Sequence, residues 1–168
     1  MVDAHIPPPP ADSATLLAAY AAARYEVHAP GGVLRLEPGV PAPPALARAL
    51  PASTWTLLTA WNPGSRPCPE VDNRHADARL QRQLDGLGLR RLPAVNSDAS
   101  GAWREPGWLV ADLGTPAADA LARCYGQAGI LHWPAASPVR LRMYLPGPAT
   151  ATGGAAPGWV DWVVASAG

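Results

Sequence analysis

The chain has 168 residues and a hydrophobic fraction of 48%, which is enough to build the core of one ordinary domain. Its thirteen basic and thirteen acidic side chains balance, which excludes the broad positive field that holds nucleic acid or an anionic membrane. Two cysteines outside any CxxC pair exclude a disulfide scaffold, and the apolar runs are too short to span a bilayer.

The two ends of the chain differ in composition from its middle. Residues 1–12 include four consecutive prolines and predict a disordered leader without the basic and apolar regions of a signal peptide, so we expect a cytoplasmic protein. Residues 13–145 predict a single α/β domain. Residues 146–168 predict a tail rich in Gly, Ala and Pro, although its apolar segment Trp159 to Val164 is expected to dock on the body or on a partner.

The first elements of the domain predict an N-terminal extension. A helix capped by Ser13 should come first, because apolar residues recur along one side of it. Strands are predicted at 25–28 and 33–36 around a Gly-rich turn, and a short helix follows around Leu46. We expect a helix and a hairpin added to the core.

The core is predicted to begin with a strand at 54–61, whose β-branched, aromatic and aliphatic residues do not alternate with polar ones. This pattern is typical of a strand buried on both faces. A helix is predicted at 72–87 from apolar residues spaced by three and four. The remaining predicted elements are strands at 89–95 and 107–113, a helix at 115–125, a strand at 130–133 and a possible fifth strand at 139–144.

From residue 54 the order of elements is strand, helix, strand, strand, helix, strand. This order is typical of a ferredoxin-like split βαβ core, within the α/β (α+β) class. In that topology the third strand lies between the first two, and the fourth flanks the first. One edge of the sheet then gathers the end of the first strand, the start of the first helix and the loop at 96–101. We predict a pocket at that edge, where a helix N-terminus offers unpaired N–H groups.

Polar and aromatic residues at this edge are the candidates for a ligand site. Amides and an arginine are recognition groups with no useful proton to exchange near neutral pH, so we expect binding of a small polar or anionic ligand. Asn73 has a second interpretation as an internally hydrogen-bonded amide, because buried amides are normally paired. The candidates are Asn62, Ser65, Asn73, Arg74, Trp103, Glu105 and Gln127.

Two further hypotheses come from other classes of protein. In the first, the chain is a small enzyme in which Glu105 is the acid or base and Arg74 or Asn62 stabilises a negative charge. Glu105 stands beside Arg104, however, and a carboxylate next to an arginine is more often half of an ion pair than a catalyst. In the second, the chain is a protein-interaction domain, or a homo-oligomer, that associates through Trp159 to Val164.

The sequence predicts no metal site and no cofactor. His75, His132 and the two cysteines lack the spacing of metal ligands. The sequence also has no Gly-rich dinucleotide motif, no phosphate-binding loop and no hydrolase motif. We therefore expect no cofactor, and no nucleic acid or membrane as a partner.

Four short motifs carry a family resemblance. They are Thr59-Ala60-Trp61-Asn62-Pro63 with Ser65, Asn73-Arg74 with Leu80, Trp103 with Glu105, and Gly126-Gln127. With these motifs the chain from about Tyr20 to Trp133 resembles a bacterial domain-of-unknown-function family, number 3293. The resemblance implies no known reaction, cofactor or catalytic residue, so the functional argument depends on the residues themselves.

Overall fold

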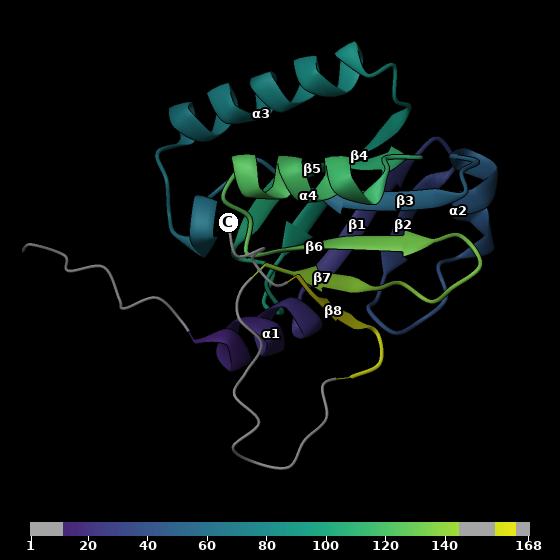
Figure 1. Ribbon diagram of the computed structural model, residues 1–168, viewed down its shortest axis with the longest axis horizontal. Helices are drawn as coiled ribbons and strands as arrows, with labels where there is room; N and C mark the ends of the chain where they lie inside the picture. The colour runs from purple at the N-terminus through teal and green to yellow at the C-terminus, as the bar shows by residue number, and fades with distance from the viewer. Residues whose placement is uncertain (1–11, 145–156, 164–168) are drawn as a thin grey trace, which may run out of the picture.

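The computed structural model describes residues 12–144 and 157–163, which form a mixed α/β structure with a curled eight-stranded sheet and four α-helices (Figure 1). In chain order the elements are α1 (Ser13–Ala22), β1 (Arg24–Ala29), β2 (Gly32–Leu36), α2 (Pro44–Ala49), β3 (Thr54–Leu58), a 3-10 turn (Pro63–Ser65), α3 (Glu70–Gly86), β4 (Arg91–Ser97), β5 (Arg104–Ala111), α4 (Thr115–Cys124), β6 (Gly129–Pro134), β7 (Leu141–Met143) and β8 (Val160–Trp162). The strand order is β2-β1-β4-β5-β3-β6-β7-β8.

The strand β3 lies in the middle of the sheet. It is antiparallel to β5 on one side and to β6 on the other, and β5 also pairs antiparallel with β4. The strand ends at Leu58 rather than at the predicted residue 61. From Thr59 onward, side-chain hydrogen bonds replace the backbone pairing of the strand. The Thr59 hydroxyl donates to the Pro106 carbonyl at 2.6 Å and accepts the Trp61 N–H at 3.0 Å.

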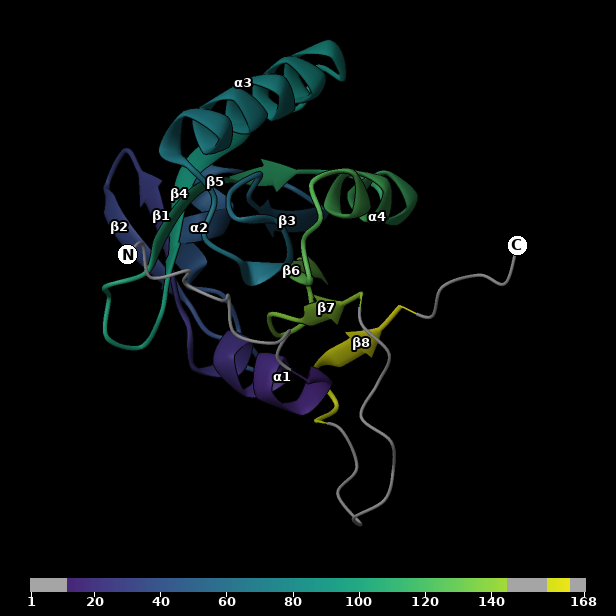
Figure 2. The ribbon, with the colours of Figure 1, turned by 90° about the vertical axis from the view of Figure 1, so that its left-hand side faces the viewer.

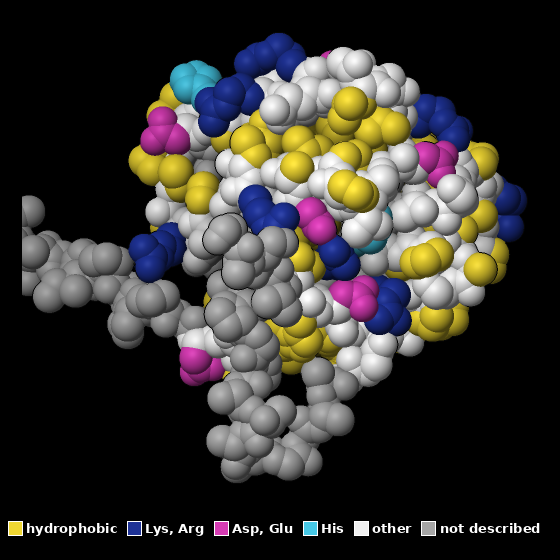
Figure 3. Space-filling model, viewed as in Figure 1, with side chains coloured by type: hydrophobic (Ala, Val, Ile, Leu, Met, Phe, Trp, Pro, Cys, Tyr) yellow, Lys and Arg dark blue, Asp and Glu magenta, His cyan; other side chains and the backbone are white. Residues whose placement is uncertain are grey.

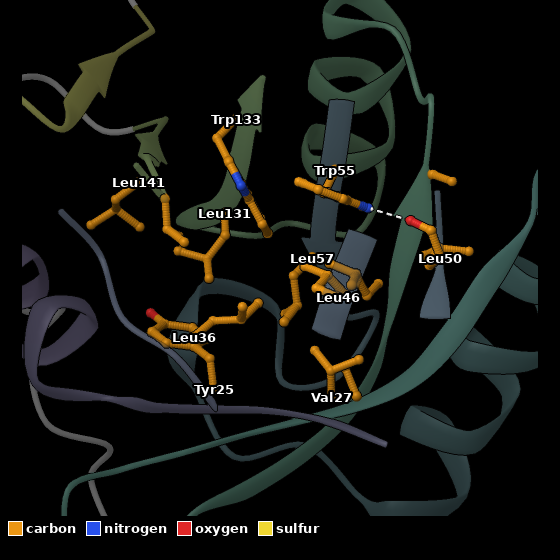
Figure 4. Packing of buried hydrophobic residues seen from close by; sticks show 14 of the residues in the cluster. Tyr25, Val27, Leu36, Leu46, Leu50, Trp55, Leu57, Leu131, Trp133 and Leu141 are labelled. Atoms are coloured by element: carbon orange, nitrogen blue, oxygen red, sulfur yellow. Dashed lines mark hydrogen bonds between the residues drawn. The ribbon is translucent and has the colours of Figure 1, made fainter. Parts of the chain in front are cut away.

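Each face of the sheet has its own hydrophobic core. Along β3, Leu57 belongs to the core under α1 and α2, whereas its neighbour Leu58 belongs to the core under α3 and α4. This alternation follows from the two-residue period of a strand. Figure 2 shows α3 and α4 on one side of the sheet and α1 on the other. Figure 4 shows the first core, in which the Trp55 indole donates to the Leu50 carbonyl at 3.0 Å.

The helix α1 is capped by Asp12 and not by the predicted Ser13. The Asp12 carboxylate accepts the N–H of Thr15 at 2.9 Å, so Ser13 becomes the first helical residue. Of the predicted disordered leader 1–12, residues 1–11 lie outside the described residues.

The strands β4 and β5 differ from the predicted ranges in a way that shapes the site. Strand β4 starts two residues late because the Leu89 N–H still bonds the Leu84 carbonyl at the end of α3. Strand β5 starts three residues early and continues through Pro106. The missing N–H of Pro106 removes no bond to β3, because β3 has already ended at this level. These shifts place Asn96 directly opposite Glu105 in the ladder.

The predicted N-terminal hairpin and the apolar segment near the C-terminus both extend the sheet. Strand β1 pairs with β4 at one end of the core, and β8 pairs in parallel with β7 at the other. Val160 is buried, and Asp161 forms an ion pair with Arg140 at 2.6 Å. On the face in Figure 3, basic and acidic side chains lie next to one another in the region of β6 to β8. The described part of the predicted segment, residues 159–163, therefore docks on the body of the protein.

The rest of the predicted tail, residues 145–156 and 164–168, lies outside the described residues. The possible fifth strand is observed as the shorter β7, which also pairs antiparallel with β6. None of the described helices is long and apolar enough to cross a membrane.

Candidate functional site

The loop after β3 is held by the side chain of Asn62. This residue adopts a left-handed backbone conformation with φ 49° and ψ 63°, which asparagine tolerates better than most residues. Its Oδ1 accepts the Cys68 N–H at 3.1 Å and the Asn73 Nδ2–H at 3.0 Å, while its own backbone N–H donates to Asn73 Oδ1 at 2.9 Å. The loop is thereby tied to the first turns of α3.

Asn73 is part of this scaffold. It is 2% exposed, and its Nδ2 also donates to the Cys68 carbonyl at 3.2 Å. Both ends of the amide are therefore used inside the protein. Of its two sequence interpretations, the structure supports the internally bonded amide, with the loop at Asn62 and Cys68 as its partner.

The carboxylate of Glu105 is held in place by two neutral donors. Its Oε1 accepts the Asn62 Nδ2–H at 2.9 Å and the Trp103 indole N–H at 2.8 Å. The predicted ion pair with an arginine is not observed within the described chain, where Arg74 pairs instead with Glu70 one helical turn away. The orientation of Glu105 is thus set by directed hydrogen bonds.

Partial burial of Glu105 disfavours its charged form. Desolvation raises the pKa of this carboxyl above the ordinary value, and the hydrogen bonds from Asn62 and Trp103 offset the rise only in part. A carboxyl with a raised pKa in the folded state contributes stability that is fully present below its unfolded pKa. This contribution is lost as the pH rises through the folded pKa.

Glu105→Gln is therefore expected to stabilise the protein near neutral pH. Glutamine keeps an acceptor for Asn62 and Trp103 but removes the desolvated charge. The gain should vanish below pH 4.5, the ordinary pKa of a glutamate, where the wild-type carboxyl is itself protonated when unfolded. Urea unfolding at a series of pH values measures the difference, and Glu37→Gln at an exposed position controls for the loss of one carboxylate. A gain that is equal at acid and neutral pH would contradict the assigned cause.

A pocket of about 310 Å³ opens between α1 and this end of the sheet. The ladder places Tyr25, Asn96 and Glu105 side by side on three neighbouring strands, and all three line the pocket. Three other predicted candidates also line it, namely Ser65, Trp103 and Gln127. Trp103 is 36% exposed and forms part of the pocket wall.

Two predicted candidates lie behind the lining, and one lies away from it. Asn62 and Asn73 support Glu105 from behind, whereas the exposed Arg74 is absent from the lining. Gln127 ties the entry of β6 to the same loop, because its Nε2 donates to the Trp61 carbonyl at 3.0 Å and to the Tyr125 carbonyl at 3.2 Å. The structure thus brings six of the seven candidates together.

Sequence reasoning missed the part of the pocket that comes from α1 and β1. Tyr20 covers the pocket, and its carbonyl accepts the Tyr25 hydroxyl at 2.8 Å. Gly129 makes this close approach possible, because a Cβ there would lie 3.2 Å from the Tyr20 ring and 2.7 Å from the Met143 sulfur. The apolar side of α1 indicated that this helix packs on the domain, but no local feature of the sequence indicates which surface it covers.

Comparison with known proteins gives one match. Residues 58–130 match the model of a family described as "Protein of unknown function (DUF3293)". No curated protein and no solved structure matches the chain. The matched range contains Glu105 with its two donors and the scaffold at Asn62 and Asn73, whereas α1 and the β1–β2 hairpin lie outside it.

Proposed function

We propose that this chain, which belongs to the DUF3293 family through residues 58–130, is a small-ligand-binding domain whose site is the pocket lined by Glu105. One observation carries the proposal. A partly buried carboxylate is fixed by two donors on one oxygen and borders a pocket, although burial disfavours its charge. A perturbed group placed at a pocket is typical of a functional site, because it does not benefit the fold.

Binding is better supported than catalysis. The enzyme hypothesis needs Arg74 or Asn62 to stabilise a developing negative charge. Arg74 is exposed and paired with Glu70, and the backbone N–H and side chain of Asn62 are all hydrogen-bonded within the scaffold. Neither Arg74 nor Asn62 is therefore free to stabilise a negative charge next to Glu105, as the enzyme hypothesis requires.

The lining also favours a polar ligand without a net negative charge. Glu105 and Asp98 both border the pocket, and no arginine or histidine of the described chain does so. A bound anion would face these carboxylates without a compensating cation. We therefore propose the polar part of the predicted ligand class and not the anionic part.

A ferredoxin-like core and a cytoplasmic location are also part of this proposal. The order and directions of β3, β4, β5 and β6, with α3 and α4 as connections, support a ferredoxin-like unit inside the larger sheet. Free Cys68 and Cys124 are consistent with a reducing cytoplasmic environment. The docked strand β8 weakens the case for a partner that binds the C-terminal segment.

Occlusion of the pocket tests the proposal. Ala18 and Ala19 are both exposed on α1, but only Ala19 lines the pocket. A panel of small amines, alcohols, amides, carboxylates and inorganic phosphate is titrated into the labelled protein. We expect at least one class to shift the Trp103 indole and Gly129 amide resonances in the wild type and in Ala18→Trp, but not in Ala19→Trp.

The two tryptophan variants also define the contrary result. If no compound moves these resonances in the wild type, the pocket is not a ligand site. If a compound moves them equally in Ala19→Trp, it binds elsewhere on the surface. Thermal unfolding of both variants checks that added bulk on α1 leaves the fold intact.

A further inference from the structure

Three side-chain oxygens at the pocket accept no hydrogen bond from a described residue. No described residue donates to Glu105 Oε2, since both hydrogen bonds reach Oε1. The side-chain oxygen of Asn96 is buried and has no partner in the part of the chain that the structure describes. The amide nitrogen of Gln127 donates twice, whereas no described group donates to its oxygen. A buried acceptor without a donor is costly, which applies to Asn96 Oδ1, and a ligand that supplies N–H groups could pair this atom and the other two oxygens.

Two donors at the pocket are already engaged, whereas the hydroxyls of Tyr20, Ser65 and Ser97 can either donate or accept. The Trp103 indole N–H is bound to Glu105, and the Tyr25 hydroxyl donates to the Tyr20 carbonyl. The Trp103 and Tyr25 donors are therefore not free for a ligand rich in acceptors. Because the hydroxyls adapt to either kind of ligand, the carboxylate and amide oxygens without a donor set the preference for a ligand that donates.

The charge and the walls of the pocket agree with this preference. Glu105 lies in the wall and Asp98 at the exposed rim, and hydrogen bonds that lower the pKa of Asp98 keep it ionised. The aromatic side chains of Tyr20, Tyr25 and Trp103 also line the pocket. Aromatic faces attract cations as well as apolar groups, most strongly where water is excluded.

From these observations we infer that the ligand is a small organic cation, a primary ammonium or guanidinium group on an apolar or aromatic body. The inference rests on the proposed function and adds the chemical class. The cationic head donates to Glu105 Oε2, with Asn96 and Gln127 as further acceptors, and the body packs against Tyr20 and Trp103. An ammonium brings three donors, whereas a hydroxyl brings one, so only the cation satisfies this set.

A matched series of three compounds tests the charge while the body stays the same. The probes are 2-phenylethylammonium, 2-phenylethanol and 3-phenylpropanoate, titrated by calorimetry and followed through the Trp103 indole resonance. We expect the ammonium to bind the wild type about tenfold or more tighter than the alcohol, since a charged hydrogen bond is worth at least that factor. The carboxylate should bind more weakly than the alcohol.

Two variants locate the preference. Glu105→Gln should reduce the affinity for the ammonium about tenfold or more and leave the affinity for the alcohol nearly unchanged. Asp98→Asn should have a smaller effect, because its carboxylate is exposed and screened by solvent. Ala19→Trp should abolish binding of both compounds.

The outcomes separate this inference from the proposed function. If the alcohol or the carboxylate binds as tightly as the ammonium, and Ala19→Trp abolishes that binding, the pocket is a ligand site but not for cations. If Glu105→Gln keeps the full preference for the ammonium, the inference is also overturned. Calcium that displaces the ammonium and shifts the same resonances would assign the acceptors to a metal ion instead. If neither this series nor the wider panel binds, the proposed function itself fails.

Discussion

Asn73→Leu is expected to lower the free energy of unfolding by about 1–3 kcal/mol or more, the cost of leaving buried polar groups without partners. The substitution leaves the Asn62 N–H and the Cys68 carbonyl without the partner that Asn73 supplies. It also removes a donor to Asn62 Oδ1. Because Asn73 is 2% exposed, water does not easily replace the lost bonds. Urea unfolding measures the loss.

The exposed neighbour His75 provides the control for this substitution. His75→Leu adds a similar apolar side chain to the same helix without breaking a bond in the scaffold. We also expect the Trp103 indole resonance to shift in Asn73→Leu, because Asn62 orients Glu105, which accepts that indole N–H. If Asn73→Leu is no less stable than His75→Leu but fails to bind ligand, Asn73 is a binding residue and not a scaffold.

Gly107→Ala is expected to destabilise the centre of the sheet by about 1–3 kcal/mol, the usual penalty for overpacking a core. Gly107 lies on β5, and a Cβ there would be 2.6 Å from the Leu58 carbonyl oxygen and 3.2 Å from the Thr59 Cβ. The nearest atom belongs to backbone and cannot rotate away, so β3 and β5 must separate. Thermal and urea unfolding record the effect.

The change at Gly107 should also weaken ligand binding, because Glu105 lies two residues away on the same strand. Gly86→Ala is the matched control, since Gly86 lies in α3 and a Cβ there meets no atom within 4 Å. That control should gain about 0.5–1 kcal/mol through the better helix propensity of alanine. Equal stability of the two variants would show that β5 accommodates a side chain at residue 107.

The central strands and most of the candidate site were predictable from the sequence, because both depend on local patterns. The run at 54–61 predicted a buried strand, and β3 is buried between β5 and β6. The placement of Arg74 was not predictable from a helix that begins at residue 72. The observed helix begins at Glu70, which puts a carboxylate one turn before Arg74 and turns the arginine away from the pocket.

The packing of α1 over the pocket could not be predicted from the sequence, for a physical reason. The contact of Tyr20 with Gly129 joins residues more than a hundred positions apart, and no local propensity encodes it. The pairing of β1 with β4 is equally non-local, and the position of Asn96 opposite Tyr25 depends on it. The spacing of hydrophobic residues predicts that one face of a helix or strand is buried, but only the folded topology determines which element packs against that face.

The pocket is built from two parts of the chain that can change independently. The carboxylate and its amide scaffold lie within residues 58–130, whereas the cover comes from α1, which lies outside that range. Substitutions in α1 at Leu16 or Ala19 alter the space above Glu105 without touching the bonds that orient it. Under the proposed function, chains that share Glu105 and its amide scaffold can therefore diverge in the size of ligand they admit while they keep the same preference for charge.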